Sequence, residues 1–200
     1  MLASIHPLGE RARHNRWGIT ATAYLAGSVA GGAALGTMLG LLGEALSGLA
    51  EPDRALTAVL IGGVCVVGAA FDLRLGSLRL PTLRRQVNED WLNQYRGWVY
   101  GVGFGFQLGL GVVTIVSSAA IYVTFILAFL SASTAAGLVV GTAFGLARAA
   151  VIFTVAVVRD PGDLRAVHRR FQRWGPLAHR AAVGMQMLIV IGAAAAAVTG

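Results

Sequence analysis

The stretch from Ala135 to Val158 constrains this chain most, because it is apolar over more than the roughly 20 residues that span a bilayer. It carries one arginine, Arg148, near its middle. Gly137, Gly141 and Gly145 precede Arg148 at helical spacing, so all four residues share one stripe of a helix. An arginine in hydrocarbon costs at least about 3 kcal/mol. We therefore expect Arg148 to face protein or trapped water.

The composition places the whole chain in a membrane. Hydrophobic residues make up 56% and charged residues 12%, against about 25% charged residues in soluble domains. The net charge of +7 could suggest nucleic-acid binding, but the arginines gather in clusters separated by pairs of apolar segments, as the positive-inside rule produces. The sequence therefore predicts an all-α, polytopic protein of a prokaryotic plasma membrane, in contact with the lipid bilayer and not with nucleic acid.

The apolar runs predict five transmembrane helices, with the N-terminus inside and the C-terminus outside. Between them, two segments with apolar residues at helical spacing and arginines on the other face predict helices lying on the inner membrane surface. Pro7 and Gly9 argue against an early helix in the N-terminal tail, which ends at an interfacial Trp17. The expected spans are residues 18–46, 55–73, 98–130, 135–158 and 181–198, and the surface helices are 80–95 and 160–174.

An internal repeat is visible at an offset of 73 residues, where six of eight positions of 66–73 and 139–146 are identical. We interpret it as a parallel duplication of a helix hairpin plus a surface helix; a chance match of glycine-rich segments is the alternative. The predicted organisation is a cytoplasmic tail (1–17), a first repeat (18–97), a second repeat (98–175) and a fifth helix (176–200). The glycines expected to pack helices closely are Gly32, Gly36, Gly105, Gly109, Gly141 and Gly145.

A polar pocket is expected where Gln107 and Arg148 both lie about 15 Å deep in their spans. Thr114 and Ser118 share a helical stripe with Gln107. Hydroxyl and amide oxygens accept hydrogen bonds from a guanidinium, and Arg148 could then bind an anion or an anionic lipid headgroup. The alternative is a structural arginine that bonds backbone carbonyls and Gln107.

Asp72, at the inner end of the second span, is expected to pair with an arginine, with Arg74 close by. Proton or cation transfer by Asp72 is the alternative. The four histidines lack the paired spacing of metal ligands, so we expect neither a metal nor a cofactor. No nucleophile, base and acid can be assembled at one membrane depth, which argues against an enzyme.

Residues 101–109, with Gly101, Gly103, Gly105 and Gly109 around Gln107, resemble the glycine-rich opening of a helix hairpin in the cytochrome c biogenesis CcdA/DsbD transmembrane family. Residues 144–146 are similar to a later glycine-rich span of that family. The resemblance implies a membrane redox protein that moves electrons through a pair of cysteines. This chain has one cysteine, Cys65, so such chemistry would need a thiol from a partner.

Three functions follow from these features. The first is a transporter-like protein with the pocket at Arg148 and Gln107, forming a homodimer through its glycine stripes. The second is a non-catalytic membrane subunit or assembly factor that docks a partner through its glycine faces and arginine-rich helices. The third is the redox role that the resemblance implies.

Overall fold

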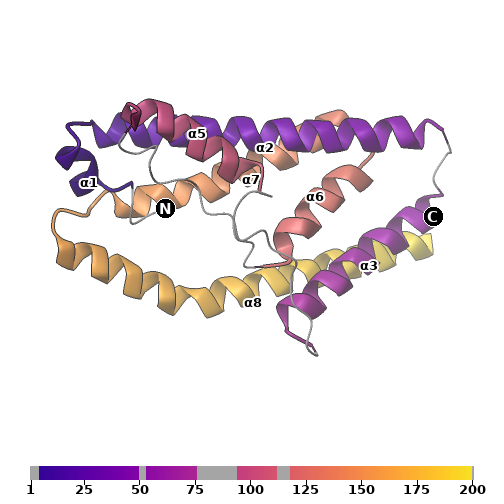
Figure 1. Ribbon diagram of the computed structural model, residues 1–200. Helices are drawn as coiled ribbons and strands as arrows, with labels where there is room; N and C mark the ends of the chain where they lie inside the picture. The colour runs from indigo at the N-terminus through magenta and orange to yellow at the C-terminus, as the bar shows by residue number, and fades with distance from the viewer. Residues whose placement is uncertain (1–4, 50–52, 76–93, 112–117, 200) are drawn as a thin grey trace. The chain divides into compact units, whose positions relative to one another are not determined.

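The computed structural model describes residues 5–49, 53–75, 94–111 and 118–199, and the regular structure in these ranges is helical. The predicted surface helix 80–95 and Thr114 lie outside the described residues, apart from the last two positions of that helix. Figure 1 shows the elements in chain order. They are α1 (Pro7–Ala12), α2 (Trp17–Ser47), α3 (Arg54–Asp72), α5 (Gly97–Gly109), α6 (Ala120–Leu130), α7 (Thr134–Ala150), the 3-10 helix η1 (Val151–Val155) and α8 (Pro161–Thr199).

Four stretches of helix are long and apolar enough to cross a membrane, namely Trp17–Ser47, Arg54–Asp72, Thr134–Val155 and Pro161–Val198. Many large apolar side chains on them are exposed, as expected where lipid takes the place of a protein core. Examples are Leu41 and Leu46 on α2, Val59 and Val67 on α3, and Leu188 and Ile191 on α8. The chain is an all-α, multi-pass membrane protein whose helices contact the bilayer.

The chain forms two compact units, each assembled from three separate stretches. Unit 1 comprises 1–35, 83–115 and 141–174, and unit 2 comprises 36–82, 116–140 and 175–200. Each unit takes residues from both predicted repeat copies. The helices α2, α7 and α8 contribute residues to both units.

Unit 1 is built on close contact of α2 with α5, which runs alongside it in Figure 1. At Gly27, Gly31, Gly105 and Gly109, an added Cβ would lie 2.0 to 2.3 Å from a carbonyl oxygen of the facing helix. Only glycine allows the two backbones to approach so closely. The core beside this contact is formed by buried apolar side chains, among them Ala21, Tyr24, Tyr100, Phe104 and Ile152.

The first part of α7 packs on the end of α2 in unit 2 in the same manner. A Cβ at Gly137 would lie 2.2 Å from the carbonyl oxygen of Gly36. The helix α6 approaches the same part of α2, since a Cβ at Gly43 would lie 2.0 Å from the carbonyl oxygen of Phe129. Glu44 of α2 accepts hydrogen bonds from the backbone N–H and the hydroxyl of Thr134, at 3.0 and 2.6 Å. A carboxylate from one helix therefore satisfies the N-terminus of another.

These glycine contacts join helices of the same chain. Gly32 approaches Gly141, Gly105 approaches Tyr24, and Gly109 and Gly145 approach the carbonyl oxygen of Ser28. A homodimer would therefore need a surface other than these stripes.

The predicted third span, 98–130, contains two short helices. The first, α5, ends at Gly109, and Gly111 takes a positive φ of 68° directly after the C-cap residue Leu110. Glycine at this position is a common way to end a helix. The second helix, α6, begins at Ala120. With 13 and 11 residues, α5 and α6 are each shorter than the roughly 20 residues of a perpendicular crossing.

The predicted surface helix 160–174 and fifth span 181–198 form one continuous helix, α8, with Pro176 inside it. Its 39 residues extend about 58 Å, nearly twice the hydrocarbon thickness. Leu164 and Val167 of the segment 160–174 are partly buried against the core of unit 1, and the location of this segment on the membrane surface stays a prediction. Contact with the buried apolar residues of unit 1 removes the side chains of Leu164 and Val167 from water, as insertion into the membrane surface would.

The N-terminal tail was predicted without an early helix, and that prediction is wrong. Pro7 occupies the first turn of α1, where its missing N–H costs nothing, and His6 caps the helix by accepting from the Gly9 N–H at 3.2 Å. Burial and the nearby positive Arg13 lower the pKa of His6, which keeps its imidazole neutral and able to accept. The side chains of Ile5 and Glu10 are buried in unit 1.

Candidate functional site

Arg148 lies in the last turn of α7 and is partly buried in unit 1. Its Nη1 donates to the carbonyl oxygen of Leu108 at 3.2 Å, and its guanidinium stands 5.4 Å from the ring centroid of Phe144. Leu108 follows Gln107, so the structure brings Arg148 to the segment of α5 that the sequence indicated. A backbone carbonyl and an aromatic face both stabilise a guanidinium. These contacts fit the structural interpretation of Arg148.

Ser28 is the point in unit 1 where three helices meet. Its hydroxyl donates to the carbonyl oxygen of Gly145 at 2.8 Å, and the side chain is fully buried. Added Cβ atoms at Gly109 and Gly145 would lie 2.1 and 2.2 Å from the Ser28 carbonyl oxygen. The glycines that place Arg148 near Leu108 are thus held against one residue of α2.

A second polar cluster lies in unit 2, where Ser118 is found. Its hydroxyl donates to Asp72 Oδ2 at 2.9 Å, the N–H of Ala119 donates to Asp72 Oδ1 at 2.7 Å, and Gln186 Nε2 donates to Oδ2 at 3.0 Å. Asp72 is 3% exposed, as is Gln186. The carboxylate from α3 therefore satisfies the N-terminus of α6.

The expected pairing of Asp72 with an arginine is not found among the described residues. Within the described ranges no ion pair reaches Asp72, and Arg74 is exposed in a left-handed conformation with φ 54°. Asp72 and Ser118 are far apart in sequence. Their contact depends on α6 starting just after Ser118, and an unbroken apolar run does not show where that helix starts. The sequence signal that could have pointed here is Asp72 itself, a carboxylate at the end of an apolar helix.

A third cluster surrounds Glu10, which is fully buried in unit 1. Its Oε1 accepts from Arg13 Nη1 at 2.8 Å and from the Tyr100 hydroxyl, and its Oε2 accepts from Thr20 Oγ1 at 2.8 Å. Gly97 leaves room for these groups, since a Cβ there would lie 2.5 Å from Thr20 Oγ1. The cluster fastens α1 to α2 and α5.

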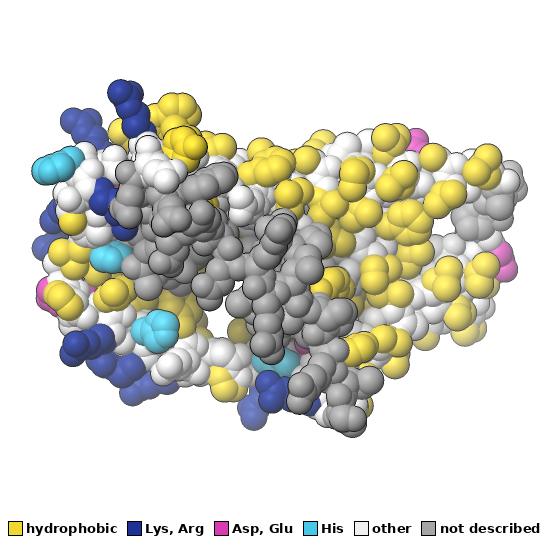
Figure 2. Space-filling view, in the orientation of Figure 1, with side chains coloured by type: hydrophobic (Ala, Val, Ile, Leu, Met, Phe, Trp, Pro, Cys, Tyr) yellow, Lys and Arg dark blue, Asp and Glu magenta, His cyan; other side chains and the backbone are white. Residues whose placement is uncertain are grey.

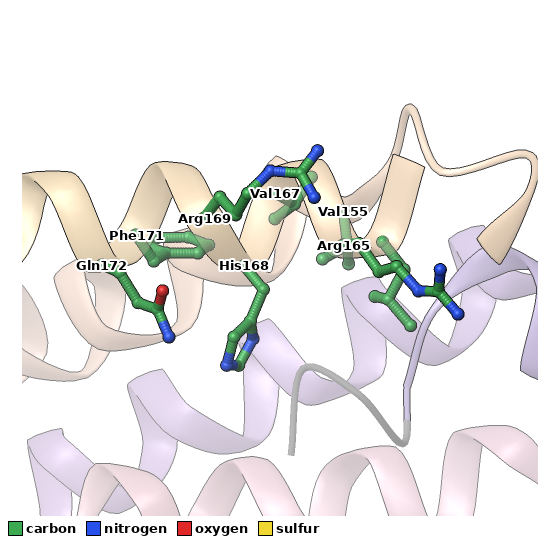
Figure 3. Close-up of a pocket in the computed structure, with 8 residues that line it drawn as sticks. Val155, Arg165, Val167, His168, Arg169, Phe171 and Gln172 are labelled. Carbon is green, nitrogen blue, oxygen red and sulfur yellow. The ribbon is translucent and has the colours of Figure 1, made fainter. Parts of the chain in front are cut away.

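A pocket of about 440 Å³ opens between η1 and the first half of α8 (Figure 3). His168 and Gln172, one turn apart, point from the same side of α8 in this view. Figure 2 shows arginine side chains in dark blue, and Arg165 and Arg169 are among the residues that line this pocket. An apolar floor with cationic edges suits a ligand that has an apolar part and a negative charge. The lining residues are Val155, Leu164, Arg165, Val167, His168, Arg169, Phe171 and Gln172.

Within the described residues, no group of three or more histidine, cysteine, aspartate or glutamate side chains is placed to hold a metal ion. Cys65 is a buried free thiol on α3.

Comparison with known proteins shows distant similarity to one kind of protein. The chain is 31% identical over 151 residues to the methylamine utilization protein MauF of Paracoccus versutus, covering 74% of this chain and 54% of the relative. It is 30% identical over 162 residues to MauF of Methylophilus methylotrophus, covering 80% of this chain and 54% of that relative. The chain therefore spans about half the length of the curated relatives it matches.

No family model matches the chain, and no solved structure matches it. The two relatives do not carry the CcdA/DsbD name, so that resemblance and the redox role it implies stay predictions.

Proposed function

We propose that this chain is a membrane component of methylamine utilization, acting in the bilayer as a subunit or assembly factor. The observation that carries the proposal is the similarity to MauF proteins from two organisms, which extends over 74% and 80% of the chain. So broad a match includes several apolar helices and their connections rather than one glycine-rich segment. The multi-pass fold supports a role inside the membrane.

The proposed topology has five crossings, with the N-terminus inside and the C-terminus outside a prokaryotic plasma membrane. Four are the long apolar helices, and α5 and α6 together make the third crossing in chain order. The arginines of α1 and of the first half of α8 then lie on the inner side, as the positive-inside rule requires. The parallel internal repeat belongs to the same proposal, with α3 and α7 as equivalent helices.

A second candidate function is transport or binding of an anionic group at Arg148 and Gln107, with Thr114 as a further ligand. What favours it is the position of a partly buried arginine inside a membrane-spanning helix. Ser118, predicted from the sequence to lie in the same pocket, donates its hydroxyl to Asp72 in unit 2. The pocket on α8 could bind an anionic lipid headgroup by the same kind of contact, through its arginines.

Growth of the native host on methylamine tests the main proposal. A strain lacking the gene should grow normally with ammonium as its nitrogen source and fail to grow with methylamine, and a wild-type copy should restore growth. Unimpaired growth of the deletion strain on methylamine would contradict the proposal. The ammonium culture controls for a general membrane defect.

The same strain separates the two candidates through Arg148. If Arg148 binds a required anion, Arg148→Leu should reach the membrane in normal amounts yet fail to restore growth on methylamine, while Arg148→Lys restores it in part. Full restoration by Arg148→Leu would reject the anion site and leave the main proposal standing. Immunoblots of the membrane fraction provide the measure of protein amount.

A further inference from the structure

The buried cluster of Asp72, Ser118 and Gln186 has one more acceptor than its donors satisfy. We propose that it binds one monovalent metal cation of the Na⁺ type, with Asp72 supplying the charge and Gln186 Oε1 a neutral oxygen ligand. The three residues come from the end of α3, the start of α6 and the second half of α8, and all lie in unit 2.

The first step is the charge of Asp72. The carboxylate is 3% exposed and accepts three hydrogen bonds, from Ser118, Ala119 and Gln186. These donors and the positive end of α6 add no full positive charge. Because no ion pair reaches Asp72 in the described part of the chain, the cluster carries one net negative charge away from water. A buried charge is costly unless a counter-charge accompanies it.

The second step is the amide of Gln186. Its Nε2 donates to Asp72 Oδ2 at 3.0 Å, and its Oε1 is buried without a hydrogen-bond partner. Turning the amide by 180° would place Oε1 against the carboxylate oxygen and leave the NH₂ group as the orphan. Two oxygen acceptors at that separation repel each other unless a positive charge lies between them. In the first orientation a cation would satisfy the orphan Oε1, and in the second a cation between Oε1 and the carboxylate oxygen would remove their repulsion.

The third step is the missing side chain of α3 beside that oxygen. Gly68 lies one helical turn before Asp72 on the same face of α3, and a Cβ there would come within 2.9 Å of Gln186 Oε1 and 2.5 Å of Val123 Cγ2. The glycine thus keeps the amide oxygen free of a side chain from α3. Gln186 is itself buried, so the oxygen faces the protein interior.

The fourth step is the choice of cation. Carboxylate, amide and hydroxyl oxygens are hard ligands, which suit alkali and alkaline-earth ions rather than soft metals. A monovalent ion neutralises the single negative charge, whereas a divalent ion would leave the buried cluster with a net positive charge. The charge balance therefore favours a monovalent ion.

Thermal unfolding of the purified full-length protein tests the site. The probe is NaCl, raised from 1 to 100 mM at pH 8 with choline chloride keeping the ionic strength constant. The Tm of the wild-type protein should rise by about 5 °C, since a ligand that binds only the folded state stabilises it in proportion to the logarithm of its concentration. Asp72→Asn, which keeps an acceptor for Ala119, should lose the Na⁺ dependence. Asp53 also accepts a hydrogen bond at the start of a helix, but its carboxylate is exposed. The Tm of Asp53→Asn should therefore rise with Na⁺ as that of the wild type does.

Gln186→Met keeps Asp72 and the side-chain volume but removes the amide oxygen. This variant should need at least about tenfold more Na⁺ for the same rise in Tm, which corresponds to a loss of about 1.4 kcal/mol of binding free energy. A wild-type Tm that does not change with Na⁺ would overturn the proposal, as would an equal rise in Asp72→Asn. If Asp72→Asn does not fold, an unchanged Na⁺ midpoint in Gln186→Met overturns it. Growth on methylamine is a separate readout, so failure here leaves the proposed function intact.

Discussion

Gly105→Ala should destabilise unit 1 severely, because the new methyl group would lie 2.0 Å from the carbonyl oxygen of Tyr24. Real Cβ contacts are essentially never shorter than 3.0 Å, so α5 and α2 must separate by about 1 Å. Separation weakens the packing along the whole glycine contact, at a cost of about 3 kcal/mol or more. Alanine gains about 1 kcal/mol of helix propensity over glycine, which is too little to offset this.

Gly63→Ala is the matched control for this substitution. Gly63 lies on α3, and an added Cβ there would meet nothing within 4 Å. The control should therefore unfold at the wild-type temperature or slightly above it. Monodisperse yield and Tm in detergent provide the measurement for both variants. Equal stability of Gly105→Ala and Gly63→Ala would contradict close packing of α2 and α5.

Glu10→Ala should have the second large effect, through loss of a fully buried carboxylate. The Tyr100 and Thr20 hydroxyls and the Arg13 guanidinium would all lose an acceptor, and the arginine would lose its ion-pair partner. Removing one member of a buried ion pair costs about 3–5 kcal/mol. Because the cluster joins α1 to α2 and α5, we expect proteolysis near the N-terminus before the rest of the protein unfolds.

Two variants control for side-chain removal and for charge. Arg11→Ala, at an exposed residue of the same helix, should change stability by less than about 0.5 kcal/mol. Glu10→Gln keeps one acceptor oxygen, so its stability should lie between those of Glu10→Ala and Arg11→Ala. Limited proteolysis of intact membranes followed by mass spectrometry distinguishes them, and wild-type resistance in Glu10→Ala would show that the cluster does not hold α1 in place.

Two of the long apolar helices could be predicted from the sequence almost to the residue. The expected spans 18–46 and 55–73 correspond to α2 and α3, because an apolar run bounded by polar residues has one stable form in lipid. The division of 98–130 into α5 and α6 was not foreseen. Its signal was Gly111, which takes a positive φ, but a single glycine does not stand out as a helix end in a segment so rich in glycine.

The polar clusters could not be predicted, because each depends on residues distant in sequence. Asp72 meets Ser118 at a separation of 46 residues and Gln186 at 114, and Glu10 meets Tyr100 at 90. Their pairing follows from where helices end, which apolar patterning does not fix. For Arg148, the sequence indicated the correct segment of α5, since the depth of a residue in a span follows from helical rise.

The proposed five-crossing topology, with the N-terminus inside, is tested most directly by cysteine labelling in intact cells. In a Cys65→Ser background, single cysteines would replace Arg54 at the start of α3, Ser131 at the end of α6 or His168 in the first half of α8, all exposed positions. A membrane-impermeant maleimide added outside should modify the cysteines at 54 and 131, and should modify the one at 168 only after the cells are broken. Modification at 168 from outside, or protection at 54 and 131, would contradict the proposed topology.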